Sequence, residues 1–317
     1  MHTRIYDSVC EIIGGTPILR LKRIPQAGWS EMLVKLESMN PGGSVKDRIG
    51  LSMIEAAEKE GRLKPGGTIV EATSGNTGIG LAMVCAAKGY KAILTMPDDV
   101  NIERIALLRA YGAQVVLTHR LELMQGAIKK AEEILREHPD YFMPQQFRNP
   151  ANPRAHRETT AREILDIIDG KLDALIVGIG TGGTATGTGE ILKQKIPHMK
   201  LVVVEPADSP VLSGGKPGMH KIQGIGAGFV PEVLNRGVID RIMTVTDEQA
   251  GSAAHRLASD EGILCGISSG AIIHASCIVA RELGPGKRIL AILPDTGERY
   301  LSTDWFHESG REEVSSP

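Results

Sequence analysis

Lys46 is the residue of this sequence with the clearest potential for covalent chemistry. It lies in the segment NPGGSVKDR (residues 40–48), where Ser44 is the expected N-cap of a helix and Lys46 falls in the first helical turn. The positive end of a helix and partial burial both lower the pKa of an amine. A neutral lysine amine can form a Schiff base with a carbonyl compound. Taken alone, however, a lysine beside a glycine turn is more typical of a solvated surface.

A second loop, GTGGT, has the composition of a phosphate-binding loop. It follows an apolar run and leads into a helical pattern, so its backbone N–H groups can converge on an anion at the positive end of a helix. A glycine turn without a ligand is the simpler interpretation. A dinucleotide site also stays open, because residues 178–183 fit G-x-G-x-x-G and Glu205 ends the next predicted strand. The candidate phosphate ligands are Gly180, Thr181, Gly182, Gly183 and Thr184.

A third loop, TSGNTG at residues 73–78, again lies between an apolar run and a helical pattern. Its hydroxyl and amide side chains, together with exposed N–H groups, can form a pocket for a carboxylate. A helix cap is the simpler interpretation of this loop, and also of Ser268, which precedes the last long helix. The candidate ligands in the loop are Thr73, Ser74, Gly75, Asn76 and Thr77.

The three loops gain meaning from their shared position at the predicted carboxyl ends of parallel strands. Ligands of open α/β sheets bind in the crevice beyond those ends. A phosphate loop, an amine at a helix start and a carboxylate pocket together describe a site for pyridoxal phosphate, which we expect as the cofactor. We expect no bound metal, because the four cysteines stand far apart without a C-x-x-C pair.

Short apolar runs alternate with helical patterns from end to end. Near-continuous Val, Ile and Leu runs separated by helices indicate an α/β fold with parallel strands buried on both faces. The predicted strands are residues 33–37, 68–72, 91–96, 113–118, 173–179, 201–205, 241–246 and 288–293. The predicted helices include residues 47–60, 79–88, 102–111, 122–137, 155–168 and 271–283. The proline-rich segment PQQFRNPANP (144–153) is the expected junction between two lobes.

Length and composition place the chain among ordinary globular proteins. Its 317 residues are enough for two domains, with 42% hydrophobic and 23% charged residues. Lys and Arg nearly balance Asp and Glu, which leaves a net charge of −2 and no basic face for nucleic acid. The first residues lack the apolar stretch of a signal peptide, and no apolar run is long enough to span a membrane. We therefore expect a cytoplasmic protein whose last residues, from Leu301, are frayed.

Many ordered motifs of this chain resemble those of the cysteine synthase (O-acetylserine sulfhydrylase) family of fold-type II pyridoxal phosphate enzymes. The matching stretches are IGGTPILRL, NPGGSVKDR, EATSGNTGIGLA, QQFRNPANP, GTGGTATG, HKIQGIGAGF, GISSGA and LPDTGERYLST. The resemblance covers nearly the whole chain. It implies two lobes, each with a largely parallel twisted sheet flanked by helices, as in the β subunit of tryptophan synthase. Residues 1–45 would pack mainly with the larger lobe, residues 46–150 would form the smaller mobile lobe, and residues 151–317 would form the larger lobe.

The resemblance also implies a role for each candidate residue. Lys46 would carry the cofactor and move the α-proton, Asn76 would bind its ring hydroxyl, and Ser268 would face its pyridine nitrogen. The loop from Gly180 to Thr184 would hold the phosphate. The substrate carboxylate would be bound by Thr73, Ser74, Gly75, Thr77 and Gln146.

The implied reaction makes L-cysteine from O-acetyl-L-serine and sulfide, with release of acetate and an α-aminoacrylate intermediate. A serine facing a neutral pyridine nitrogen fits this chemistry, because a weaker electron sink favours prompt loss of a β-leaving group. The family forms homodimers and can bind the C-terminal tail of serine acetyltransferase. Two alternatives stay open: an isozyme that uses O-phosphoserine or another sulfur donor, and a non-catalytic regulatory partner of serine acetyltransferase. The presence of Lys46, Asn76 and Ser268 argues against the second.

Overall fold

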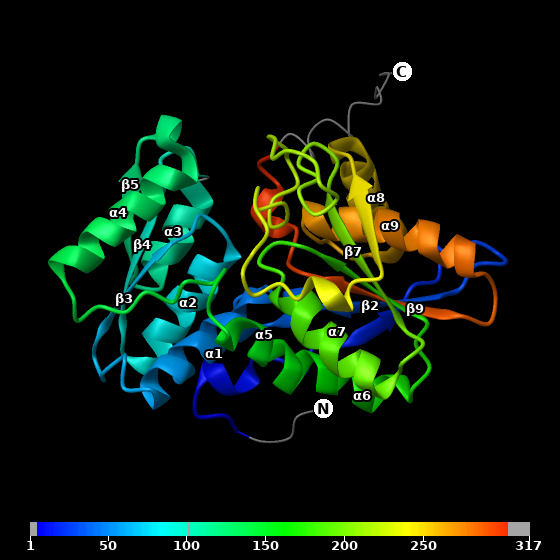
Figure 1. The fold of residues 1–317 in the computed structure, drawn as a ribbon, viewed down its shortest axis with the longest axis horizontal. Helices are drawn as coiled ribbons and strands as arrows, with labels where there is room; N and C mark the ends of the chain where they lie inside the picture. Colours follow the sequence, from blue (N-terminus) through cyan, green and yellow to red (C-terminus); the bar gives the residue numbers. More distant parts are fainter. Residues whose placement is uncertain (1–4, 101, 304–317) are drawn as a thin grey trace, which may run out of the picture.

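Two sheets of unequal size organise the chain in the computed structural model, which describes residues 5–100 and 102–303 (Figure 1). The larger sheet has six strands in the order β1-β2-β9-β6-β7-β8, and the smaller sheet has the order β3-β4-β5. All strand pairs are parallel except β1 with β2. The strands are β1 (Ile18–Arg20), β2 (Glu31–Leu36), β3 (Thr68–Ala72), β4 (Lys91–Pro97), β5 (Gln114–Thr118), β6 (Ala174–Gly178), β7 (Lys200–Pro206), β8 (Arg241–Val245) and β9 (Arg288–Leu293).

Helices cover both faces of each sheet, which explains why the inner strands are apolar on both sides. The helices are α1 (Lys46–Lys59), α2 (Asn76–Lys88), α3 (Ile102–Ala110), α4 (Leu123–Glu137), α5 (Ala151–Ala155), α6 (Ala161–Ile168), α7 (Gly183–Lys195), α8 (Asp247–Glu261) and α9 (Ile267–Leu283). A π-helical turn, His156–Thr160, joins α5 to α6. Within the described ranges, none of the helices combines the length and the apolarity that a membrane span needs.

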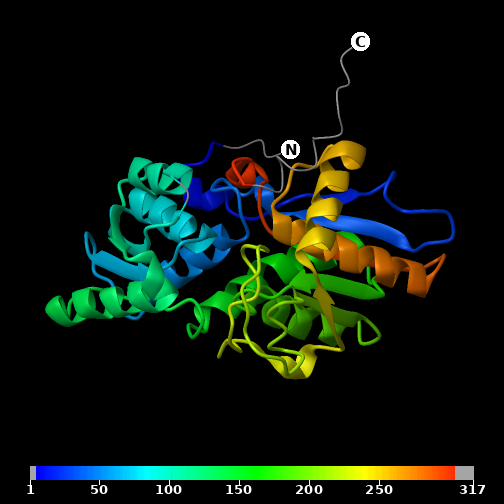
Figure 2. The ribbon, with the colours of Figure 1, turned by 90° about the horizontal axis from the view of Figure 1, so that it is seen from above.

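Alternate residues of the larger sheet face different helices. Ile176 and Val204 pack with Leu257 of α8 and Ile272 of α9, in the first core cluster. Leu175 and Val203 belong to the opposite cluster, together with residues of α6 and α7. Figures 1 and 2 show the same arrangement, with the orange α9 on one side of the sheet and the green α7 on the other. The N-terminal strands β1 and β2 lie in this larger lobe, beside β9.

The smaller sheet carries its own core. Ile69, Leu94 and Met96 pack with residues of α1 and α2 in a single apolar cluster. On the other face, Thr95 donates a 2.7 Å hydrogen bond to the carbonyl of Ala127 in α4. The four helices α1–α4 therefore enclose β3–β5 as a second α/β lobe, on the left in Figure 1.

Several predicted elements differ from the observed ones. The predicted helix 155–168 begins earlier, at Ala151, and contains the π-helical turn. The expected N-cap at Ser44 is off by one position, because Val45 precedes the first helical residue; the Ser44 hydroxyl still accepts from the Lys46 N–H at 3.2 Å. The predicted frayed tail lies outside the described residues from position 304 onwards.

Candidate functional site

Lys46 opens α1 and is half-buried. Burial lowers the pKa of its amine, against the opposing effect of the carboxylates of Asp295 and Glu37. Among the described residues, no hydrogen bond or ion pair engages its Nζ. The amine is thus held at a helix N-terminus in an environment that favours its neutral, nucleophilic form.

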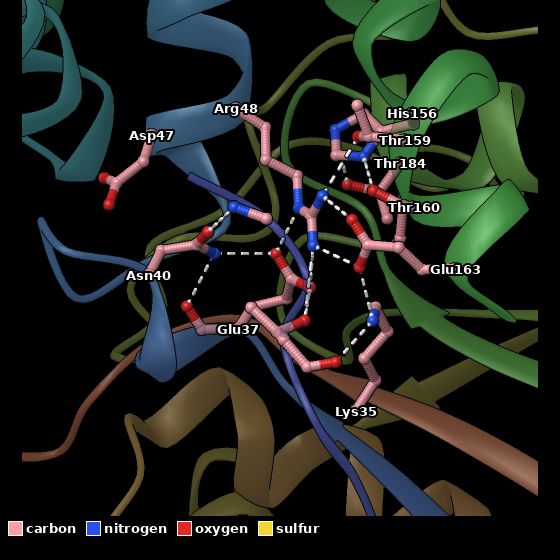
Figure 3. Close-up of polar contacts among 12 residues, drawn as sticks. Lys35, Glu37, Asn40, Asp47, Arg48, His156, Thr159, Thr160, Glu163 and Thr184 are labelled. Atoms are coloured by element: carbon pink, nitrogen blue, oxygen red, sulfur yellow. Dashed lines mark hydrogen bonds and ion pairs between the residues drawn. The ribbon is translucent and has the colours of Figure 1, made fainter. Parts of the chain in front are cut away.

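A buried network of charges anchors the helix that carries Lys46 (Figure 3). Arg48, two residues further along α1, donates to Glu37 through Nε at 2.7 Å and to Glu163 of α6 through Nη1 at 2.6 Å. Lys35 of β2 pairs with the same Glu163 at 2.7 Å. Burial alone would raise the pKa of Glu37, but the Arg48 guanidinium holds it below its usual range. Because these charges are paired in the interior, the start of α1 is tied rigidly to both β2 and α6.

The GTGGT loop leads directly from β6 into α7. Gly182 adopts a left-handed backbone with φ of 81°, and α7 starts at Gly183 without a side-chain cap. A Cβ on Gly183 would lie only 1.8 Å from Oδ1 of Asn152, so no larger residue fits there. The uncapped N–H groups at the start of α7 and the hydroxyls of the loop can hold an anion such as a phosphate.

The two threonines of this loop are held by one residue of the lobe junction and one residue that follows it. Thr181 accepts a 2.9 Å hydrogen bond from the Asn152 amide, and the Thr184 hydroxyl lies 3.2 Å from Nε2 of His156. Burial lowers the pKa of His156 to about 3, helped by the nearby Arg48 charge, so this imidazole is neutral. Figure 3 shows His156 between Thr160 and Thr184, above the Arg48 network.

Glu205 does not serve a ribose. Its buried carboxylate accepts hydrogen bonds from the N–H groups of Leu212 and Ser213 at 2.8 and 2.9 Å, and from the Ser213 hydroxyl at 2.6 Å. The dinucleotide alternative for residues 178–183 is therefore wrong, because the acid it requires already holds the following loop.

The TSGNTG loop places its polar side chains at the start of α2, which also has no side-chain cap. Thr77 donates a 2.6 Å hydrogen bond to Oε1 of Gln146, and both side chains are buried. This contact joins the loop to the junction segment and leaves the Gln146 N–H donors for another acceptor. Thr73 lies at the carboxyl end of β3 and accepts from the Gly75 N–H at 3.3 Å.

Ser74 is fixed through its backbone by a residue that the sequence did not single out. Arg104 of α3 donates to the Ser74 carbonyl at 3.0 Å and to the side chain of Gln223 at 2.8 Å. Gln223 belongs to the long loop between β7 and β8 of the larger lobe. Arg104 therefore connects the TSGNTG loop of one lobe to the other lobe.

Ser268 is the second residue of α9 and is buried. A helix N-cap role is excluded, since Gly266 occupies that position. A Cβ on Gly224 would lie 3.7 Å from the Ser268 hydroxyl, and a Cβ on Gly180 would meet the Gly224 carbonyl at 2.4 Å. Gly224 thus links Ser268 to the start of the GTGGT loop.

The segment PDTGERY, which follows β9, contributes three further residues to the site. These residues, Asp295, Arg299 and Tyr300, were not among the predicted site residues. Asp295 is buried and accepts from the Asn76 amide at 2.6 Å and from the Tyr300 hydroxyl at 2.5 Å. Arg299 donates to Oδ1 of Asn76 at 2.6 Å and also bonds the Gly42 carbonyl. The sequence pointed to this segment only through the family motif LPDTGERYLST, because the burial of Asp295 is visible only in the structure.

Backbone and side-chain contacts bring the predicted loops close together. The residue before Lys46 is joined to the end of β9, since the Val45 N–H donates to the Pro294 carbonyl at 2.8 Å. Asp295 accepts from Asn76, and Gln146 and Asn152 connect the Asn76 loop to the GTGGT loop. The start of α9 lies at the same place, because the Gly266 N–H donates to the Asp295 carbonyl at 3.2 Å. The structure therefore brings the anion loop, the lysine, the carboxylate loop and the α9 start together at the carboxyl ends of β3, β6 and β9. In the described part of the chain, no group of His, Cys, Asp and Glu could hold a metal ion.

Comparison with known proteins gives consistent matches along the chain. The family model described as "Pyridoxal-phosphate dependent enzyme" matches residues 9–295. A cysteine synthase of Staphylococcus aureus is 56% identical over 307 residues, covering 96% of this chain and 99% of that protein. The crystal structure of a cysteine synthase (OASS) from Entamoeba histolytica matches with a TM-score of 0.94 and 42% identity, over 97% of this chain and 92% of that one. An O-ureido-L-serine synthase structure also reaches a TM-score of 0.94, at 46% identity over 99% and 98% of the two chains.

Proposed function

The chain belongs to the pyridoxal-phosphate dependent enzymes, and we propose that it is a cysteine synthase that makes L-cysteine from O-acetyl-L-serine and sulfide, with release of acetate. The observation that carries this proposal is that contacts bring together the helix start with Lys46, the TSGNTG loop and the uncapped, glycine-rich start of α7. The cofactor is pyridoxal phosphate.

The residues present fit this cofactor. Lys46 offers an amine whose pKa is lowered by burial, which favours the neutral form that bond formation with the cofactor aldehyde requires. The GTGGT loop leaves no space for side chains at Gly180 and Gly183, so its backbone can approach a phosphate closely. Next to it, Oδ1 of Asn152 is buried without a hydrogen-bond partner among the described residues. A phosphate brings no donor for this oxygen, so the fit to the cofactor rests on the Lys46 amine and on the open backbone of the GTGGT loop.

We assign the substrate carboxylate to the start of α2. The positive end of this uncapped helix, the Thr73 hydroxyl and the backbone of Ser74 and Gly75 attract a carboxylate, while Thr77 gives its hydroxyl proton to Gln146 and so orients that amide. Gln146 adds an amide N–H, because its oxygen already accepts from Thr77. Held here, the amino acid would lie at the start of α2, the helix that packs against the start of α1 with Lys46.

Bound pyridoxal phosphate supplies the electron sink that makes the α-proton of the amino acid acidic and its β-substituent labile. The Lys46 amine would take the α-proton and return it at the end, and its lowered pKa favours the neutral form that accepts a proton. Ser268 would donate a hydrogen bond to the pyridine nitrogen without protonating it. Over the whole reaction, the Cβ–O bond of O-acetylserine breaks and acetate leaves, and a Cβ–S bond forms with sulfide.

Assembly and closure belong to the same proposal. Residues 46–150 would close over the amino acid as a mobile lobe against residues 151–317, with residues 1–45 on the larger lobe. A homodimer is supported by the exposed apolar side chains of Ile12, Leu19 and Met39 near the edge strand β1. Sedimentation of the purified protein tests the dimer. Calorimetry with the C-terminal peptide of serine acetyltransferase tests that partner, and cell fractionation tests the cytoplasmic location.

The substrate is tested by offering sulfide with O-acetylserine or O-phosphoserine, and O-acetylserine with sulfide or homocysteine. We expect O-acetylserine with sulfide to give the highest kcat/KM, with cysteine and acetate formed in equal amounts. A preference for O-phosphoserine or for homocysteine would replace the proposed reaction by that of a related enzyme of the same family. A colourless protein without turnover would indicate the non-catalytic regulatory partner.

A further inference from the structure

The amide of Asn76 lies between two oppositely charged side chains from the segment after β9. Its Nδ2 donates to Oδ2 of Asp295 at 2.6 Å, and its Oδ1 accepts from Nη1 of Arg299 at 2.6 Å. The opposite orientation of the amide would set its N–H groups against the guanidinium and its oxygen against the carboxylate. Only one orientation of Asn76 is therefore compatible with these neighbours.

Both neighbours are themselves held in place. Asp295 is 2% exposed, and its carboxylate accepts from the Tyr300 hydroxyl at 2.5 Å. Its carbonyl accepts from the Gly266 N–H at 3.2 Å, and its backbone forms an isolated antiparallel bridge with Ser44. Its second oxygen, Oδ1, is buried without a hydrogen-bond partner in the described structure. Arg299 also bonds the Gly42 carbonyl, in the loop that leads to Lys46. The pair thus ties the Asn76 amide to the same framework as the lysine.

We infer that Asp295 and Arg299 are positioning residues that orient the Asn76 amide, so that its second Nδ2 proton is given to the ring oxygen of pyridoxal phosphate. This rests on the cofactor assigned under the proposed function, and on no particular substrate. An amide has two N–H donors, and the carboxylate of Asp295 takes one. A donor held towards an ionised ring oxygen stabilises it, whereas a freely rotating amide could equally present its own oxygen.

A double-mutant cycle tests the inference on the full chain, with the apparent dissociation constant and absorption spectrum of bound pyridoxal phosphate as readouts. Asp295→Ala is expected to weaken cofactor binding about tenfold or more, as the loss of one hydrogen bond to a charged group predicts. When Asn76 is already alanine, Asp295→Ala should change the logarithm of the apparent dissociation constant by less than a third of the change that it causes alone. A larger residual effect, or no effect of Asp295→Ala alone, would overturn the inference. Asp173→Ala is the matched control. It removes a carboxylate just before the amino end of β6, away from the site at the carboxyl end, and should leave cofactor binding unchanged.

A second variant separates orientation of the donor from mere support of the fold. In the double substitution Asn76→Asp with Asp295→Asn, a hydrogen bond between the two positions, the Tyr300 contact and the Arg299 contact can all be kept. Only the N–H towards the ring is replaced, by a carboxylate. We expect this variant to unfold within a few degrees of the unaltered protein, yet to bind the cofactor at least tenfold more weakly with a shifted visible band. Cofactor binding and a spectrum equal to those of the unaltered protein would show a structural role only and overturn the inference. Neither experiment uses O-acetylserine or sulfide, so a wrong substrate assignment would leave both results interpretable.

Discussion

Ser268 is a position where the residue that best suits the helix differs from the residue that best suits the reaction. It is the second residue of α9, where an aspartate is favourable for the helix because of the positive end of the dipole. In our account its hydroxyl faces the pyridine nitrogen. Ser268→Asp should therefore fold and bind pyridoxal phosphate, yet release acetate much more slowly, because a protonated ring holds the electrons of the α-carbon more strongly.

Rapid mixing with O-acetylserine, followed by absorbance and acetate release, measures this effect. Ser269→Asp has its substitution one position along the same helix turn and serves as the comparison for burying a carboxylate there. Acetate release by Ser268→Asp at the rate of the unaltered protein would remove the serine from the reacting site.

For single residues, the sequence was informative where a residue type is unusual for its position in a helix or loop. A lysine at a helix start and glycines after a strand both break the ordinary preferences, and the structure brings them together. Asp295, Arg299 and Arg104 could not be recognised in this way, because charged residues in loops are ordinarily solvated. Their importance depends on burial and on partners that are up to 223 residues away along the chain, as for Arg299 with Asn76.

Among the elements, β3 carries a buried acid that links it to the lobe junction. Glu71 accepts from the backbone N–H groups of Gln145 and Gln146, at 2.9 and 3.1 Å. Burial raises the pKa of its carboxyl to about 7, in spite of these hydrogen bonds. The folded protein therefore holds a proton that the unfolded chain loses between its ordinary pKa of 4.5 and about 7. In this window the free energy of unfolding should fall as pH rises.

Glu71→Gln isolates this effect, because glutamine has similar size and does not titrate. The free energy of unfolding of the variant, relative to the unaltered protein, should increase by up to about 1.4 kcal/mol per pH unit between pH 4.5 and 7 and stay constant above. Denaturant unfolding of both holoenzymes across this range measures the difference, in which all other groups cancel. A difference that does not change with pH would show that Glu71 keeps its ordinary pKa.

Strands and long helices of this chain were largely predictable, and the exceptions have physical causes. Apolar runs such as residues 288–293 give β9 because an inner strand is buried on both faces. The edge strand β1 escaped prediction, since it has three residues and two of them are exposed. The alanine- and serine-rich α8 lacks a marked apolar stripe and was also missed, although its capping box, Thr246 with Gln249, is a sequence signal.

For the whole molecule, Arg104 is one of the side chains that couple the lobes at the TSGNTG loop, beside Asn76 with its bonds to Asp295 and Arg299. Its bonds to the Ser74 carbonyl and to Gln223 join α3, the TSGNTG loop and the larger lobe. We expect Arg104→Leu to raise KM for O-acetylserine about tenfold or more, because each lost bond to a charged group costs about 1.5–3 kcal/mol. The effect on kcat should be smaller, since no reacting atom is touched.

Steady-state kinetics of Arg104→Leu and Arg109→Leu provide the comparison. Arg109 lies on the same helix, exposed, and its loss should leave KM nearly unchanged. Equal changes in KM for the two variants would mean that Arg104 acts through the helix and not through the contact between the lobes.

The central claim, that the molecule is a cysteine synthase working through Lys46, is tested most directly by product analysis of the holoenzyme and of Lys46→Ala. With O-acetylserine and sulfide, we expect the unaltered protein to form L-cysteine and acetate in equal amounts. Lys46→Ala should form neither above the background rate and should lack the visible band of the bound cofactor, even when saturated with pyridoxal phosphate. Cysteine formation by Lys46→Ala at the rate of the unaltered protein, or none by the unaltered protein, would contradict the account.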